Sequence, residues 1–177
     1  MPEKEWSERF AAGRKDCSRE KKFKEYPIGF VHIDITEVRT DQGKSYLFVA
    51  IDRATKYVYV ELYSKMSVKE SGAFLKNLIA HCPFKITKIL TDNGPQFTYE
   101  LLAEHLKPKN KTYPFDELCK EHCIEHRLTK FKHPWTNGQV EVTNRILKQY
   151  TTKAYFYKDL DELKKHMLTF VLYYNHQ

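Results

Sequence analysis

Lys85-Ile86-Thr87-Lys88-Ile89-Leu90-Thr91-Asp92-Asn93-Gly94-Pro95-Gln96-Phe97 is the stretch of sequence that decides the fold. Its β-branched and apolar residues from Ile86 to Thr91 predict a strand, and the residues after Asp92 predict a turn that opens a helix. Open α/β sheets place ligand chemistry just outside the carboxyl ends of their strands, so Asp92 is a candidate metal ligand or base. The alternative is an ordinary Asx-type turn with Gly94 at positive φ.

The composition describes a single globular domain with a basic surface. The length of 177 residues is sufficient for a core that needs no disulfide or structural metal. Hydrophobic residues make up 41% and charged residues 30%, which excludes a disordered chain. The longest apolar runs are only as long as a strand, so no membrane partner is expected. The net charge of +7 favours a polyanion such as nucleic acid as the partner, although many basic proteins have none.

The cysteines indicate a reducing compartment. No apolar signal segment opens the chain, so free thiols and a cytoplasmic location are expected. Cys119 and Cys123, together with His122 and His126, are compatible with a zinc site, but no second ligand pair follows at finger spacing. Cysteines on a helix packed against a sheet are the other interpretation.

Two parts of the chain differ in composition and in their pattern of apolar residues. Residues 1–25 are charge-dense with few periodic apolar positions, which predicts a basic lead-in or linker, whereas residues 26–177 predict an α/β core. In that core, three β-rich runs joined by hairpin-like connections predict an antiparallel meander. The predicted strands are Phe30–Thr36, Ser45–Ile51 and Tyr57–Leu62.

Asp34 interrupts the otherwise apolar first strand, which suggests a use for the carboxylate unless the position is an exposed edge. Helical spacing from Ser67 to Ala80 predicts a helix, with Ser67 as its N-cap. This helix crosses over to the strand at residues 86–91, which is therefore expected to run parallel to the first strand. Asp34 and Asp92 then lie near the same end of neighbouring strands. Two carboxylates placed this way repel each other unless a cation neutralises them.

The second half of the chain is predicted to be mainly helical. Helices are expected at 95–106 and 115–122, a strand at 124–128, a long helix from Thr136 or Asn137 to about Tyr157, and a last helix capped by Asp159. The buried stripe predicted for the long helix is Val140, Thr143, Leu147, Tyr150 and Ala154. An adjacent face of that helix carries Glu141, Arg145 and Lys148.

Three blocks of sequence together carry a resemblance that spacing alone does not establish. They are His32-Ile33-Asp34-Ile35-Thr36, Thr91-Asp92-Asn93-Gly94-Pro95-Gln96-Phe97, and His133-Pro134-Trp135-Thr136-Asn137-Gly138-Gln139-Val140-Glu141. They resemble, in order, the blocks of the catalytic core shared by retroviral integrases and bacterial insertion-sequence transposases. The last residues, Tyr173 to Gln177, resemble the tyrosine-asparagine segment that in bacterial members leads into an arginine-proline-histidine tripeptide, so we expect the core to be truncated at its C-terminus.

The resemblance implies a ribonuclease-H-like fold: a five-stranded mixed sheet flanked by helices. It implies that Asp34, Asp92 and Glu141 form an acidic triad that holds two Mg²⁺ or Mn²⁺ ions, which suits hard cations because they prefer carboxylate oxygens. The implied reaction is DNA nicking followed by strand transfer at a phosphodiester. The implied partners are the ends of a mobile element, target DNA and further copies of the chain in a homo-oligomer, inside the cytoplasm of a bacterium and associated with its nucleoid when bound to DNA.

The chain also departs from the family pattern. Val142 follows Glu141 where many relatives carry arginine, so Arg145 and Lys148 are expected to supply that phosphate contact. Further expected DNA contacts are Asn137, Lys130 and Lys132. No helix-turn-helix pattern precedes the core, which leaves open a catalytically silent fragment that only binds DNA or multimerises. A nuclease acting on RNA-DNA hybrids is the other alternative.

Overall fold

The computed structural model describes residues 26–103, 105, 107, 112–129 and 138–176. Its centre is a five-stranded sheet in the order β3-β2-β1-β4-β5. The strands are β1 (Phe30–Thr40), β2 (Gly43–Asp52), β3 (Val58–Tyr63), β4 (Lys88–Thr91) and β5 (Glu125–Leu128). The helices are α2 (Val68–His81), α3 (Pro114–Glu121), α4 (Gly138–Tyr150) and α5 (Leu160–Asn175).

The first three strands form the predicted antiparallel meander, and β1 and β2 run further than the sequence predicts. Pairing continues to Thr40 opposite Gly43, so only two residues form the turn, and Gly43 adopts a φ of 123° that suits glycine. The second connection is held by Asp52. Its buried carboxylate accepts hydrogen bonds from the main-chain N–H of Gly29 and Thr55, so its role is structural.

Helix α2 makes the predicted crossover. Its N-cap is Ser67, whose hydroxyl accepts a hydrogen bond from the N–H of Lys69 at 3.2 Å. The chain then returns as β4, which pairs with β1 in parallel, and β5 adds to β4 in parallel. The sheet is therefore mixed, as expected.

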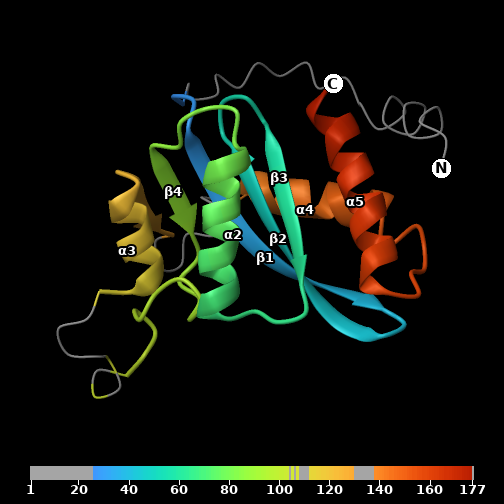
Figure 1. Ribbon diagram of the computed structural model, residues 1–177, viewed down its shortest axis with the longest axis horizontal. Coiled ribbons are helices and arrows are strands. Elements are labelled where there is room, and N and C mark those ends of the chain that lie inside the picture. Colours follow the sequence, from blue (N-terminus) through green and yellow to red (C-terminus); the bar gives the residue numbers. More distant parts are fainter. Residues whose placement is uncertain (1–25, 104, 106, 108–111, 130–137, 177) are drawn as a thin grey trace.

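Helices cover both faces of this sheet (Figure 1), and each face has its own apolar core. One core joins the sheet to α2 and α3 through residues such as Ile33, Phe48 and Phe74. The other joins it to α4 and α5 through residues such as Val49 and Leu147. Across the described residues, no helix is both long and apolar enough to cross a bilayer.

The prediction of a helix at residues 95–106 is wrong, because the described residues from Pro95 to Ala103 form turns. A single turn forms here and does not continue into a helix. The N–H groups of Phe97 and Thr98 both donate to the carbonyl of Gly94, and the Thr98 hydroxyl accepts from the N–H of Glu100. A threonine that bonds its own neighbouring backbone in this way competes with a helix.

The helix predicted to reach Tyr157 also ends early, at Tyr150. The N–H of Lys153 donates to the carbonyl of Lys148, five residues back, and the N–H of Ala154 donates to the carbonyl of Thr151. These bonds turn the chain out of the helix, so Ala154 is exposed and does not belong to the buried stripe. Residues 136 and 137, predicted to cap this helix, lie outside the described residues.

Candidate active site

The three predicted acidic residues come from β1, the end of β4 and the first turn of α4. In the parallel pair, Val31 pairs with Ile89 and His32 pairs with Leu90. The same register, extended by two residues, places Asp34 opposite Asp92. Asn144 of α4 donates from Nδ2 to Oδ2 of Asp34 at 2.6 Å, which fixes the helix against β1. Glu141 lies three residues before Asn144 and hence on nearly the same side of α4.

Asp92 and Glu141 both act on the charge of Asp34. The pKa of Asp34 is raised from its ordinary 3.8 to about 6, first because burial disfavours its charge, and further because Asp92 and Glu141 repel it. The hydrogen bond from Asn144 acts in the opposite direction. This edge of the sheet therefore concentrates negative charge.

Asp92 is held by the turn that follows it. Its Oδ1 accepts a hydrogen bond from the N–H of Gly94 at 2.9 Å, so the predicted Asx-type turn is present. Gly94 is not at positive φ, however. A Cβ at this position would meet the end of the buried Gln96 side chain, which would have to move to make room. The turn geometry and a ligand role for Asp92 are therefore compatible.

The predicted DNA contacts fall into two groups. Arg145 is exposed on α4, and Lys148 is half-buried with its pKa lowered first by burial and then by Lys153. Asp34 and Glu37 partly oppose this shift, which places Lys148 within electrostatic reach of the acidic edge. The other predicted contacts, Asn137, Lys130 and Lys132, lie outside the described residues.

Two buried polar residues beside the acidic edge were missed by the sequence reasoning. Asn144 is 6% exposed on the buried face of α4, and the available signal was a polar residue one turn after Glu141 in an otherwise buried stripe. His32 is fully buried two residues before Asp34, and neither ring nitrogen has a hydrogen-bond partner. Burial, followed by the charges of Arg53 and Lys56, lowers the pKa of His32 to about 4, so the ring is neutral near pH 7.

The zinc interpretation is not supported. Within the described ranges, no three His, Cys, Asp or Glu side chains are grouped so that they could hold a metal ion. Cys119 is buried on α3, as the packing interpretation predicts, whereas Cys123 is exposed. His126 bonds Asp116 through Nδ1 at 2.5 Å.

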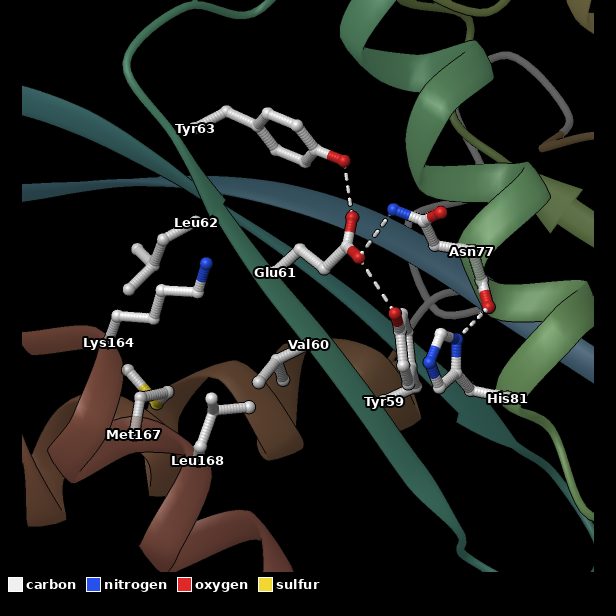
Figure 2. A pocket seen from close by; sticks show the side chains of 10 residues that line it. All are labelled: Tyr59, Val60, Glu61, Leu62, Tyr63, Asn77, His81, Lys164, Met167 and Leu168. Carbon is white, nitrogen blue, oxygen red and sulfur yellow. Dashed lines mark hydrogen bonds between the residues drawn. The ribbon is translucent and has the colours of Figure 1, made fainter. Parts of the chain in front are cut away.

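A separate cavity of ≈ 400 Å³ lies at the edge of the sheet formed by β3, between α2 and α5. Figure 2 shows Glu61 at its centre, with its carboxylate accepting hydrogen bonds from Tyr59, Tyr63 and Asn77. None of the three predicted acidic residues lines this cavity.

The sheet order, the parallel β1–β4 pair and the helices on both faces define a ribonuclease-H-like fold. The chain belongs to the integrase core domain family: one family model of that description matches residues 24–134 and a second matches residues 122–177. The predicted integrase or transposase catalytic core is thus confirmed, and the function supported for the family is polynucleotidyl transfer.

Solved structures of integrases share this fold. The catalytic core of HTLV-2 integrase in complex with magnesium, in a trimeric form, is 24% identical with a TM-score of 0.60, covering 82% of this chain and 83% of that one. The catalytic core domain of BIV integrase is 19% identical, with a TM-score of 0.60 and 81% of each chain covered. A simian T-cell lymphotropic virus intasome bound to PP2A regulatory subunit B56 gamma is 23% identical, with a TM-score of 0.63 over 89% of this chain and 55% of that one.

One curated relative is the uncharacterized protein K02A2.6 of Caenorhabditis elegans, which is 29% identical over 117 residues. The match covers 66% of this chain and 8% of that protein, so the chain corresponds to a small part of its relative.

Proposed function

We propose that this chain is the catalytic core of a transposase that nicks DNA and transfers the strand, using Asp34, Asp92 and Glu141 as its acidic triad. The observation that carries the proposal is that Asp34 on β1 lies beside the end of β4, which leads into Asp92, and is hydrogen-bonded by Asn144 of the helix that carries Glu141. A buried carboxylate with a raised pKa, such as Asp34, beside the carboxyl end of a neighbouring strand is typical of catalytic sites.

The donor set suits Mg²⁺ or Mn²⁺. All three side chains offer hard carboxylate oxygens, and the repulsion that raises the pKa of Asp34 is the kind that a cation relieves. In the residues the structure describes, the carboxylates are not yet grouped as a metal site, so ion binding has to reorient at least one of them. Glu141 is suited to this movement because it is exposed and has a long side chain.

When bound, such ions activate a water or a 3′-hydroxyl and stabilise charge on the leaving oxygen. The chain's own residues have separate tasks. Asn144 orients Asp34, the N–H of Gly94 orients Asp92, and α4 presents Glu141. Arg145 and Lys148 on the same helix carry positive charge toward a DNA backbone that approaches this edge.

The structurally similar integrases include a trimeric form and an intasome, and together with the basic composition they support DNA and further copies of the chain as partners. A bacterial, cytoplasmic setting stays a prediction.

The test is Mn²⁺-dependent nicking and strand transfer on duplex DNA. We expect Asp34→Asn, Asp92→Asn and Glu141→Gln each to abolish nicking while the circular dichroism spectrum stays unchanged. Asp41→Asn in the hairpin and Glu117→Gln on α3 are matched controls, since both carboxylates are exposed and lie away from the site. Nicking that survives all three triad changes contradicts the proposal.

Two further outcomes identify the alternatives. DNA binding without nicking, and without stabilisation by Mn²⁺, assigns the chain as a silent DNA-binding fragment, because an ion that binds the native state must raise the melting temperature. Cleavage of RNA-DNA hybrids in preference to duplex DNA assigns it as a nuclease.

A further inference from the structure

A chain of hydrogen bonds supports the main chain at Asp92 from the α3 side of the sheet. The hydroxyl of Thr91 contacts Nε2 of His126 at 2.8 Å, and Nδ1 of His126 contacts Oδ1 of Asp116 at 2.5 Å. The same Thr91 hydroxyl donates to the carbonyl oxygen of Asp92 at 3.0 Å. Three elements therefore meet at the residue before Asp92: β4, β5 and α3.

Thr91 and His126 are buried on the side of the sheet opposite α4, whereas the side chain of Asp116 is 35% exposed. Side chains alternate along a strand, so Thr91 lies on the face of Ile89, which belongs to the core under α2 and α3. Thr91 is fully buried, and the side chain of His126 is 5% exposed against the ring of Phe115. The hydrogen bond between Thr91 and His126 holds its geometry because water does not compete for it there.

The ring of His126 links the other two residues. One ring nitrogen contacts the Thr91 hydroxyl and the other contacts the Asp116 carboxylate, so Asp116 holds the ring and the ring holds the hydroxyl that donates to the Asp92 carbonyl. Loss of the Asp116 carboxylate removes the partner of Nδ1 and leaves the ring less firmly held.

The turn after Asp92 is tied to β5 as well. The N–H of Thr129 donates to the carbonyl of Thr91 at 2.9 Å, and Asn93 donates from Nδ2 to the carbonyl of Thr129 at 3.0 Å. The main chain is thus held before and after Asp92. The Asp92 carboxylate itself accepts a hydrogen bond from the N–H of Gly94 and has a 3.5 Å contact with Gln96.

We propose that Asp116, His126 and Thr91 act as positioning residues that fix the orientation of Asp92 from behind the sheet. The inference rests on the proposed function in one respect, because it treats Asp92 as a metal ligand. Partners that orient a ligand in this way commonly change metal affinity 10- to 100-fold when they are removed.

The experiment uses the variants Thr91→Val, Thr91→Ser and Asp116→Asn in the full chain. Thr91→Val removes the hydroxyl without changing the shape of the side chain, and Thr91→Ser restores the hydroxyl. Thr151→Val is the matched control, since Thr151 is also fully buried and its hydroxyl donates to a main-chain carbonyl, that of Leu147 at 2.6 Å, away from Asp92.

Two readouts are independent of catalysis. The first is the hydrogen-exchange rate of the Gly94 amide relative to core amides such as that of Val49, measured without metal. The second is the Mn²⁺ concentration that gives half of the maximal rise in melting temperature. We expect Thr91→Val and Asp116→Asn to speed Gly94 exchange selectively and to raise that Mn²⁺ concentration about tenfold. Thr91→Ser and Thr151→Val should leave both readouts near the wild-type values.

The proposal is overturned if Gly94 and core amides speed up in parallel, since that describes a general loss of stability, or if Thr91→Val changes neither readout. Its failure is distinct from that of the proposed function. A wild-type chain that never nicks DNA refutes the catalytic assignment, whereas selective exchange at Gly94 still tests the positioning chain.

Discussion

Asn144 and Asp34 lie 110 positions apart in the sequence and are joined by a hydrogen bond of 2.6 Å from the amide of one to the carboxylate of the other. This bond connects α4 to β1 at the acidic edge. It also lowers the pKa of Asp34 against the stronger effect of burial.

We expect Asn144→Ala to lower the free energy of unfolding by about 1.5–3 kcal/mol, the usual contribution of a hydrogen bond to a charged group. It should also raise the pKa of Asp34 further, because the bond that favours the carboxylate is lost. Urea unfolding and NMR titration of Asp34 measure the two effects. Asn77→Ala is the control, since Asn77 also donates to a carboxylate, that of Glu61, but at an exposed site. Equal effects of the two variants contradict the prediction.

Asp34→Asn should stabilise the metal-free protein at neutral pH. The folded-state pKa of about 6 lies above the ordinary 3.8, so the carboxylate costs stability above pH 6, and this cost disappears as the pH falls toward 4. At ~1.4 kcal/mol per pH unit the full effect is about 3 kcal/mol. Thermal melts in EDTA between pH 4 and 8 measure it, with Asp41→Asn as the control. A variant that is less stable than the wild type at pH 7.5 refutes the prediction.

His32 should make the protein sensitive to mild acid. Its folded-state pKa of about 4 lies below the ordinary 6.5, so the unfolded state takes up a proton that the folded state excludes, and stability falls as the pH drops from 6.5 toward 4. The loss reaches about 3 kcal/mol at ~1.4 kcal/mol per pH unit. His32→Leu should remove this dependence. Because Asp34 changes in the opposite direction in this range, the informative quantity is the difference between wild type and variant at each pH.

Asn175 should be needed for the attachment of α5 to the edge of the sheet. Its side chain accepts from the N–H of Val58 and donates to the carbonyl of Val58, both at 2.8 Å, as a neighbouring strand does. Asn175→Ala leaves two main-chain groups without these partners, and we expect a loss of about 1–3 kcal/mol in urea unfolding. His176→Ala, at the exposed neighbouring position, is the control. Unchanged exchange of the Val58 amide in Asn175→Ala argues against this role.

Elements with strong local signals were predictable from the sequence. The β-rich runs and their hairpin-like connections predicted β1, β2 and β3, the Ser67 and Asp159 caps fixed the starts of α2 and α5, and the crossover predicted the parallel β1–β4 pair. Where local bonds competed with periodicity, prediction failed. The turns after Pro95 and the early end of α4 both depend on short-range hydrogen bonds that an apolar pattern does not reveal.

The sequence by itself determined which residues are acidic, on which elements they lie and to which family the blocks are similar. Only the tertiary structure decided how they are held. Asn144 on Asp34 and His126 behind Thr91 join segments that are distant in the chain, and both depend on the register of β1, β4 and β5 and on the docking of α3 and α4. Local preferences act over a few residues, whereas a buried polar group finds its partner only after the sheet and helices have packed.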